Sequence, residues 1–339
     1  MKIIIFNDRP DYMGGTAYYL RFKEIMLMHS IEVHIVNLSK FWVIFARIDM
    51  LIWKNIGISI LSFFRLIKII NVGSNIIYGS NIFLPKWLRK KLDIKVIGWF
   101  PDFQVHDLPQ YFTKRQRRNR LKFEKKMFRF CDQLVVQNIN DKCRLQKLVS
   151  TIPIEIFSFY EMKRNNLANV EFTPKESFIL VAAQGWVHKR IDKIIEAYAN
   201  SSKKISLVII GKLHDQRDLN YTKRLNDLIV STNVSFLGFV SENKKIQLYQ
   251  ECLAVLNFSV YEGWNSSVEE ALAYEKPLIL SDTHFHRDQV GNALFVDSVE
   301  DLTSIFSGQT EIENEIDYQA QKQRRLETVK NFIISMEML

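Results

Sequence analysis

Two glutamates in the second half of the chain could do chemistry, because seven residues separate Glu262 from Glu270 where a strand is expected to lead into a helix. The apolar run from Leu253 to Val260 predicts a buried strand, and the polar loop after it predicts a helix that begins at Ser266 or Ser267. One carboxylate would follow the end of a strand, and the other would lie in the first turn of the helix. Ligands bind at that edge of an open parallel sheet, where helix N–H groups favour phosphate and carboxylates accept hydrogen bonds from sugar or ribose hydroxyls.

A simpler explanation exists for the second glutamate. Ser266 with Glu269, and Ser267 with Glu270, both fit the Ser-x-x-Glu pattern of a capping box. In a capping box the glutamate would serve the start of the helix and not a ligand. The residues alone leave both explanations open.

Cations follow another predicted strand, which spans Phe178 to Ala183. Lys189 and Arg190 lie a few residues beyond it, in the order Gly-Trp-Val-His-Lys-Arg that begins at Gly185. Positive side chains at the carboxyl end of a strand can neutralise a diphosphate. An ordinary solvated loop is the alternative.

A third segment at the end of a predicted strand carries hydrogen-bond acceptors and an imidazole. After the strand expected from Ile94 to Phe100 come Asp102, Gln104, His106 and Asp107. An imidazole titrates near neutral pH, although a histidine in a turn is structural more often than catalytic.

Two glycine-containing turns could bring the backbone close to a ligand. Gly14 and Gly15 follow the first predicted strand and precede a helix that Thr16 could cap, although an ordinary turn also explains them. Gly238 and Phe239 end a predicted strand, where a flat base could lie against the backbone. The sequence contains neither Gly-Lys-Ser nor Gly-Lys-Thr, so an ATPase is not expected.

The 339 residues exceed the usual size of one domain, and predicted strands alternate with helix-length segments in both halves. This alternation predicts two α/β domains with parallel sheets. We expect a first domain at 1–160, a polar linker at 161–176, a second domain at 177–317 and a final helix at 318–339.

Basic residues are concentrated in the first half. Residues 1–155 contain 26 Lys and Arg against 12 Asp and Glu, whereas the remainder contains 20 against 25, within a total net charge of +9. A second cluster of cations runs from Lys86 to Lys91. A predicted helix around Phe123 carries on one face a basic stripe, which consists of Arg115, Arg118, Lys122, Lys125 and Arg129.

Three explanations fit the basic stripe: a solvated helix face, a nucleic-acid partner and an anionic membrane surface. Solvated faces normally mix both signs of charge, and only Glu124 dilutes this one. No nucleic-acid-binding motif accompanies the stripe, so no nucleic-acid partner is expected. Attraction to the anionic cytoplasmic leaflet is the preferred interpretation. Charges interrupt the apolar stretch from Phe41 to Ile70, so we expect it to lie in the interface or to form a buried helix pair.

The beginning of the sequence and the cysteines favour a cytoplasmic protein. The apolar run that follows Met1 and Lys2 is too short for the core of a secretory signal. Cys131, Cys143 and Cys252 are few and widely spaced, which is typical of reduced core thiols and of neither a disulfide framework nor a metal site.

The segment around the two glutamates resembles the signature of family 4 glycosyltransferases. In that signature, two glutamates separated by seven residues are followed by Ala-Leu-Ala, then by Lys-Pro and a strand. These are Ala271 to Ala273, Lys276-Pro277 and Leu278 to Leu280 in this chain. The family usually has Phe-Gly-Leu-Pro where this chain has Trp264 to Ser267.

The resemblance implies a site for a nucleotide-sugar. Glu262 and the amides of the loop after it would meet the sugar and diphosphate, and Glu270 would hold the ribose. Lys189 or Arg190 would face the diphosphate, whereas Gln184 stands where the family usually has an arginine. The implied donor-binding residues are Gly14, Gly15, Gln184, Lys189, Arg190, Gly238, Phe239, Glu262, Gly263, Trp264, Asn265, Ser266 and Glu270.

The stretch from Trp99 to Phe112 resembles the Pro-Asp-Phe-Gln-His loop of family members that build bacterial surface polysaccharides. Val105 stands where that loop has its histidine, and His106 follows. The resemblance implies an acceptor side formed by Asp102, Gln104 and His106. The implied catalytic residues are His106, Asp107, Lys189 and Glu262.

As a whole, the resemblance implies two facing Rossmann-like domains of the GT-B type with a ligand cleft between them and a final helix that packs back on the first domain. It implies retaining transfer from a UDP-, GDP- or dTDP-sugar to a lipid-linked or oligosaccharide acceptor, as in O-antigen or capsule synthesis, without a cofactor or bound metal. The protein would be peripheral at the inner face of the membrane. A nucleotide-sugar epimerase or phosphorylase, and a non-catalytic membrane or nucleic-acid adaptor, are the alternatives.

Overall fold

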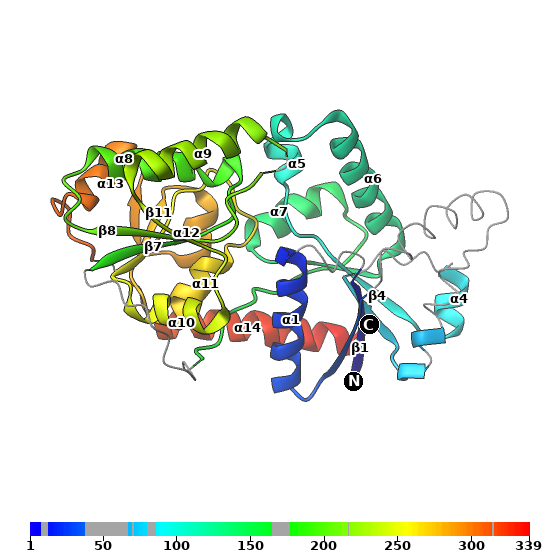
Figure 1. Cartoon of the computed structure of the whole chain (residues 1–339). Coiled ribbons are helices and arrows are strands. Elements are labelled where there is room, and N and C mark those ends of the chain that lie inside the picture. Colours follow the sequence, from blue (N-terminus) through cyan, green and yellow to red (C-terminus); the bar gives the residue numbers. More distant parts are fainter. Residues whose placement is uncertain are drawn as a thin grey trace. The chain divides into compact units, whose positions relative to one another are not determined.

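The computed structural model describes residues 1–7, 13–37, 67–69, 71–79, 86–164, 177–215, 217–313 and 315–339 (Figure 1). Their contacts form two compact units. Unit 1 comprises Met1–Val105, Phe112–Phe159 and Arg325–Leu339. Unit 2 comprises His106–Tyr111 and Tyr160–Arg324.

Unit 1 is built on a six-stranded parallel sheet with the strand order β2-β1-β3-β4-β5-β6. The strands are β1 (Lys2–Asn7), β2 (Glu32–Asn37), β3 (Ile76–Tyr78), β4 (Lys95–Trp99), β5 (Gln133–Val136) and β6 (Ile154–Ile156). The helices of this part of the chain are α1 (Met13–Met28), α4 (Lys86–Lys91), α5 (Gln104–Asp107), α6 (Lys114–Phe130), α7 (Ile139–Leu148) and α14 (Tyr318–Glu337). Residues 106–107 of α5 and the first turns of α14, up to Arg324, group with unit 2.

Unit 2 repeats the arrangement with the strand order β12-β11-β10-β7-β8-β9, again entirely parallel. Its strands are β7 (Phe178–Ala182), β8 (Ser206–Ile210), β9 (Ser235–Gly238), β10 (Ala254–Asn257), β11 (Leu278–Ser281) and β12 (Leu294–Val296). Its helices are η1 (Pro109–Tyr111), η2 (Val187–Lys189), α8 (Ile191–Asn200), α9 (Leu219–Thr232), α10 (Glu242–Glu251), α11 (Ser266–Ala273), α12 (His284–Val290) and α13 (Val299–Phe306). The predicted pair of parallel-sheet halves is therefore confirmed.

The central strands form because they can be buried on both faces. Ile3, Ile4 and Ile5 of β1 are completely inaccessible, and so are Leu278, Ile279 and Leu280 of β11. Strands covered by helices on both faces are typically continuous aliphatic runs and not alternating patterns. This explains why the longer strands were visible in the sequence, whereas β3 and β12, with three residues each, were not predicted.

Several smaller expectations need correction. Gly14, Gly15 and Thr16 lie in the first turns of α1 and not in a loop before it, so Thr16 does not cap the helix. The Thr16 hydroxyl instead accepts a hydrogen bond from the Asn7 side chain at 3.2 Å. Cys143 is exposed and is not a core thiol, whereas Cys131 and Cys252 are buried.

The described residues contain no helix that is both long and apolar enough to cross a membrane. The expectation for Phe41 to Ile70 lies outside the described residues except at 67–69. Most of the predicted linker, 165–176, lies outside them as well.

The last helix contributes an aromatic side chain to the core of unit 1. Phe332 of α14 is completely buried, and its ring lies 5.3 Å from that of Phe157 and 6.0 Å from that of Tyr78, between ring centres. Phe22 closes the cluster from α1, with its ring 4.0 Å from the Tyr78 ring. Burial of this side chain therefore fixes the C-terminal turns of α14 to the sheet of unit 1.

We expect Phe332→Ala to lower the free energy of unfolding by about 3–5 kcal/mol, because it removes buried apolar surface and leaves a cavity. Ile334→Ala is the matched control on the same helix, since Ile334 is 54% exposed, and it should change stability by less than about 0.5 kcal/mol. Urea unfolding of the full chain measures both values. Equal losses in the two variants would show that α14 is not held by this face.

Candidate functional site

The strand order of unit 2 marks one position on its sheet as a natural ligand site. From β7 the chain moves to β8 and β9 on one side, and β10, β11 and β12 then follow on the other side. The order therefore reverses between the neighbouring strands β7 and β10. In open α/β sheets, ligands bind outside the carboxyl ends of the strands at such a reversal.

The loops that leave β7 and β10 are joined at this position by an ion pair. The Nζ atom of Lys189, in the loop after β7, lies 2.5 Å from Oε1 of Glu262, in the loop after β10. The two side chains are only 14% and 9% exposed. A backbone hydrogen bond of 2.9 Å from Val260 N–H to the His188 carbonyl ties the same two loops. The structure thus brings together two residues that the sequence placed 73 positions apart.

The electrostatics of the site keep Glu262 ionised and its two neighbouring histidines neutral. Burial raises the pKa of Glu262, but nearby positive charge, above all that of Lys189, more than offsets it, so the pKa lies below its usual value. Burial, with the charge of Lys189, lowers the pKa of His188 to about 3. Burial also lowers the pKa of His286, which is completely inaccessible. Near neutral pH, Lys189 and Glu262 are therefore the charged groups of this cluster.

Glu270 is held from a different helix. It lies in α11, where its two carboxylate oxygens accept hydrogen bonds from Lys245 Nζ at 2.9 Å and Tyr249 Oη at 2.7 Å. Lys245 and Tyr249 are four residues apart on α10, so they occupy one face of that helix. A carboxylate offers about four lone-pair positions, which leaves capacity for a hydroxyl of a ligand.

The capping hypothesis for the second glutamate is wrong. Helix α11 begins at Ser266, and its N-cap is Asn265, whose side chain accepts a hydrogen bond from the Ser267 N–H at 3.1 Å. Neither serine forms the expected box. Glu269 instead accepts a hydrogen bond from the Gln289 side chain at 2.8 Å.

The neighbours of Lys189 have different environments. Arg190 has a left-handed backbone, with φ of 51°, and its guanidinium carbon lies 4.0 Å from the centre of the buried Phe258 ring. The half-buried Gln184 uses its backbone carbonyl to accept a hydrogen bond from the Trp186 N–H. Gly185 packs so closely that an added Cβ would lie 2.6 Å from the Leu213 Cα atom. Lys189 is therefore the cation that this loop directs toward Glu262.

The remaining predicted donor-side residues lie at the same carboxyl edge of this sheet or in α1. Gly238 ends β9 with φ of 65°, and the next side chain, Phe239, is 73% exposed. Gly263 and Trp264 lie in the loop that carries Glu262 and are partly buried. Gly14 and Gly15 belong to unit 1.

The predicted acceptor-side residues lie in and just before the short helix α5. The Gln104 N–H donates to Asp102 Oδ1 at 2.9 Å, and the Gln104 side chain is buried. His106 and Asp107 are exposed and group with unit 2, whereas Asp102 and Gln104 group with unit 1. The catalytic and acceptor roles of these residues remain predictions.

Four residues of the site cluster were not given roles from the sequence: Lys245, Tyr249, His286 and Gln289. The Lys-x-x-x-Tyr spacing of the first two is compatible with any solvated helix face. Nothing in the sequence around His286 and Gln289 indicates that α12 packs on the Glu262 loop. Long-range packing, which a single sequence does not display, places all four.

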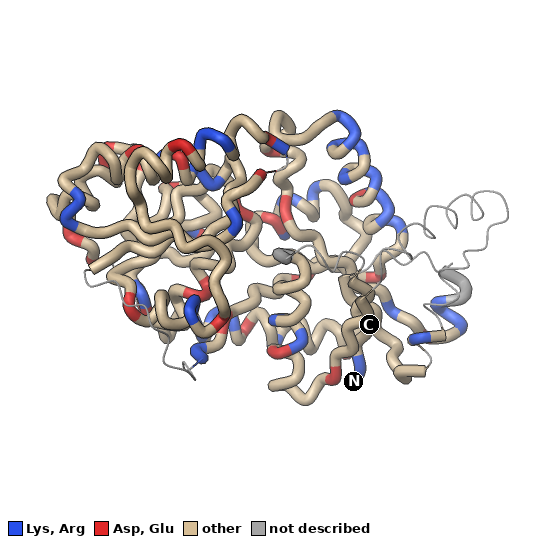
Figure 2. The backbone as a smooth tube through the Cα atoms, in the orientation of Figure 1, with Lys and Arg blue, Asp and Glu red and all other residues tan. Residues whose placement is uncertain are grey.

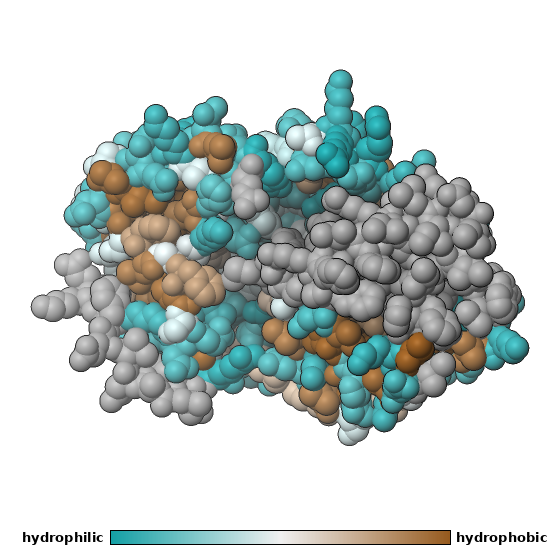
Figure 3. All heavy atoms as spheres, turned by 45° about the vertical axis from the view of Figure 1, so that its right-hand side comes forward, coloured by the Kyte–Doolittle hydropathy of each residue, from teal (hydrophilic) through white to brown (hydrophobic). Residues whose placement is uncertain are grey.

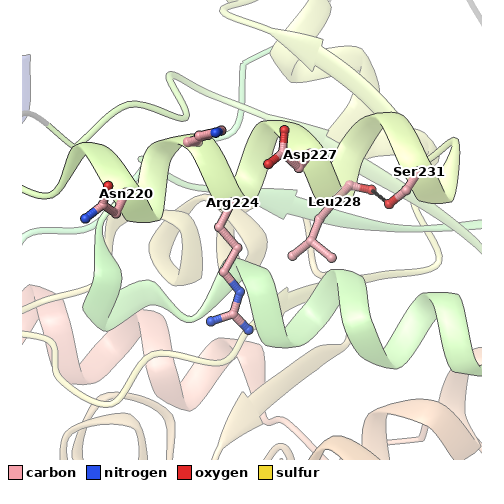
Figure 4. A pocket seen from close by; sticks show the side chains of 6 residues that line it. Asn220, Arg224, Asp227, Leu228 and Ser231 are labelled. Atoms are coloured by element: carbon pink, nitrogen blue, oxygen red, sulfur yellow. Dashed lines mark hydrogen bonds between the residues drawn. The ribbon is translucent and has the colours of Figure 1, made fainter.

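A separate hollow of about 530 Å³ lies along α9 (Figure 4). Its lining consists of Asn220, Lys223, Arg224, Asp227, Leu228 and Ser231. Arg224 is engaged there by the carboxylates of Glu196 and Asp192. The hollow contains none of the residues of the Lys189–Glu262 cluster.

Residues 162–321, which contain the whole Lys189–Glu262 cluster, match the family model described as Glycosyl transferases group 1. This match covers just under half of the chain. Over 123 residues, the chain is also 31% identical to the O-antigen chain mannosyltransferase RfbU of Salmonella typhimurium. That match covers 36% of this chain and 35% of RfbU, so it spans about a third of the length of the relative.

Solved structures of similar fold extend over the whole chain. The Anabaena protein HepE, solved with UDP and glucose, superposes with a TM-score of 0.66 at 16% identity, and the match covers 100% of both chains. The lipopolysaccharide outer core galactosyltransferase WaaB superposes with a TM-score of 0.58 at 13% identity, covering 99% of this chain and 100% of WaaB. At such low identities the likeness establishes the fold alone. The predicted GT-B fold class is confirmed.

We expect the contribution of Glu262 to the free energy of unfolding to decrease as the pH falls. Because its pKa in the folded chain is lowered from 4.5, the contribution is fully present above about pH 4.5 and is lost as the pH falls through the lowered value. Glu262→Gln should therefore destabilise the protein by about 3–5 kcal/mol at pH 7, the cost of breaking a buried pair, and by less in acid.

Urea unfolding of wild type and Glu262→Gln across this pH range measures the difference. Glu275→Gln, at an exposed glutamate, is the control. A difference that grows as the pH falls would show that burial outweighs Lys189 and that the pKa of Glu262 is raised.

Proposed function

We propose that this protein is a retaining glycosyltransferase that moves a sugar from a nucleotide-sugar to a lipid-linked saccharide acceptor in the synthesis of a bacterial surface polysaccharide. The observation that carries the proposal is the Lys189–Glu262 pair at the strand reversal of unit 2, next to the start of the helix that holds Glu270. The match of residues 162–321 to the glycosyl transferases group 1 family model supports it. The activity of RfbU, an O-antigen chain mannosyltransferase, supports the class of acceptor.

In this proposal the donor is held mainly by groups of unit 2 at the carboxyl edge of its sheet. An ammonium group has three N–H donors, and Lys189 directs one to Glu262, so the others can meet the diphosphate. The N–H groups at the start of α11 add partial positive charge near the same place. Glu270 then accepts the ribose hydroxyls, and Phe239 offers an exposed ring to the base.

Catalysis would rest on stabilising the departing diphosphate. Negative charge grows on the leaving phosphate as the bond to the sugar breaks, and Lys189 is already fixed beside it. We propose that this charge, with the α11 amides, serves without a bound metal. The acceptor hydroxyl would attack from the face that the diphosphate leaves, with His106 and Asp107 as the predicted groups near it.

The experiment supplies purified protein with UDP-, GDP- or dTDP-sugars, with and without a lipid-linked acceptor, and measures nucleotide release and the anomeric configuration of the product. Release that requires the acceptor, with retained configuration, supports the proposal. An epimerase would convert the donor without an acceptor, and an adaptor would release nothing.

Within this assay, Lys189→Ala should lower turnover by about a hundredfold or more, the scale of losing one preorganised charge-stabilising group. Arg190→Ala is the matched control, because the Arg190 guanidinium lies against Phe258 and not against Glu262, and it should be the milder change. If Arg190→Ala is the more damaging variant, Arg190 and not Lys189 meets the diphosphate. If neither change slows transfer, this loop does not bind the donor.

The basic stripe supports a peripheral membrane position for the same enzyme. All five of its cations are exposed along α6 (Figure 2), whereas Glu124 is buried. In the space-filling view, hydrophilic side chains cover the top of unit 1, where α6 lies (Figure 3). The second cluster contributes less than expected, because Arg89 is buried against Asp132. Each exposed cation near an anionic leaflet contributes about 1 kcal/mol before screening.

Replacing Arg115, Arg118, Lys122 and Lys125 with Ser should reduce sedimentation with anionic liposomes, most at low salt, and leave nucleotide binding unchanged. The control replaces four exposed lysines of unit 2 with Ser, at Lys203, Lys204, Lys212 and Lys223, which matches the loss of charge. Equal loss in both variants would mean that net charge, and not α6, attracts the protein to the membrane. Unchanged sedimentation of the α6 variant would remove the membrane from the proposal.

A further inference from the structure

Asn265 connects the carboxylate of Glu262 to the start of α11. Its side-chain Nδ2 donates to Glu262 Oε1 at 3.1 Å. Its Oδ1 accepts from the Ser267 N–H at 3.1 Å and from the Ser267 hydroxyl at 2.8 Å. The residue is 3% exposed. Reversing the amide would turn its N–H groups toward the Ser267 N–H, so the surrounding donors and acceptors fix its orientation.

The backbone of Asn265 is fixed from a second helix. The Asn265 N–H donates to Gln289 Oε1 at 3.2 Å, and Gln289 Nε2 donates back to the Asn265 carbonyl at 2.9 Å. Gln289 belongs to α12 and is 1% exposed, so this pairing is sealed from water. Contacts from α11 and α12 therefore hold Asn265 in the position from which its side chain contacts Glu262.

The two oxygens of Glu262 have different surroundings as a result. Oε1 accepts hydrogen bonds from both Lys189 and Asn265. Oε2 accepts none from any residue that the structure describes, and the side chain keeps 9% of its surface exposed. The carboxylate is thus held through one oxygen and has acceptor capacity on the other.

We propose that Asn265 is a positioning residue that holds Glu262 through Oε1 and thereby presents Oε2 to a hydroxyl of the donor sugar. The sugar part rests on the proposed function, whereas the hold on Glu262 does not. Similar glycosyltransferases usually have glycine at this position of the loop, and glycine has no side chain that could reach the glutamate. The contact is therefore a property of the Trp264-Asn265-Ser266-Ser267 sequence of this chain.

Asn265→Ser separates this role from simple helix capping. Serine is as good an N-cap as asparagine, but it lacks the amide N–H that reaches Glu262. Asn138→Ser is the matched control, because Asn138 caps α7 by accepting from the Asp141 N–H at 2.7 Å and also donates to the Asp141 carboxylate at 2.9 Å. Both variants lose one amide-to-carboxylate contact and keep a serine cap.

The first measurement is a carboxyl NMR titration of ligand-free protein labelled at glutamate, with the Glu262 signal assigned by its loss in Glu262→Gln. Asn265→Ser should raise the pKa of Glu262, because the carboxylate loses a donor while Lys189, His188 and His286 still face it. Asn138→Ser should leave the Glu262 titration unchanged. An unchanged titration in Asn265→Ser overturns the proposed hold on Glu262.

The second measurement is transfer kinetics with the nucleotide-sugar that wild type uses. Asn265→Ser should lower kcat roughly tenfold to a hundredfold, the scale of a misplaced catalytic group, while its melting temperature stays close to that of Asn138→Ser. A shifted titration with unchanged kcat overturns the sugar contact and keeps the hold. A shifted titration in Asn265→Ser, together with a wild type that transfers no sugar, overturns the proposed function and supports the hold.

Discussion

The candidate site depends on one buried contact, the ion pair between Lys189 and Glu262. Removing two charges from water costs several kcal/mol each, and their attraction offsets this only where further hydrogen bonds complete the geometry. Asn265 supplies such a bond to the carboxylate, and the His188 carbonyl ties the backbone of the two loops. The ion pair and this backbone contact together hold the two loops that follow β7 and β10 in one arrangement.

The parallel sheet makes this meeting possible. Because the strand order reverses between β7 and β10, their carboxyl ends lie side by side although no loop connects them directly. Side chains occupy the space outside these two strand ends. Gly185 and Gly211 let the neighbouring loops pack at this edge, since added Cβ atoms would lie 2.6 Å and 2.0 Å from the backbone of Leu213 and Ala183. His188 and His286 interact electrostatically with the pair and are neutral near pH 7, so they add no competing charge. The surroundings leave the cation and the carboxylate as the groups that a ligand would meet.

The sequence predicted those parts of the fold that depend on local pattern. Aliphatic runs such as Ile3 to Phe6 form strands that are buried on both faces, and an unbroken aliphatic run already indicates this in the sequence. The spacing of Glu262 and Glu270 placed one carboxylate after a strand and the other in the next helix, as the structure has them. The sequence could not decide between ligand binding and helix capping for Glu270, because any Ser-x-x-Glu pattern is compatible with a capping box. The residue that caps the helix is Asn265, and contacts from Gln289 and Ser267 determine that choice. The partners of Glu270 could not be predicted either, since Lys245 and Tyr249 contact it from a helix about 20 residues earlier in the chain.

Charge is distributed by different rules at the site and on the surface of unit 1. At the site, cations and anions form ion pairs at short range. The local electric field therefore depends on how the pairs are oriented and not on an excess of either charge. On α6 the acidic residue of the helix, Glu124, is turned inward, and the basic cluster of α4 likewise directs Arg89 inward to Asp132. A helix that is held by its Met127 face and its Thr113 capping box gains no stability from five exposed like charges, which repel one another. The excess of positive charge on that face is therefore not a requirement of folding.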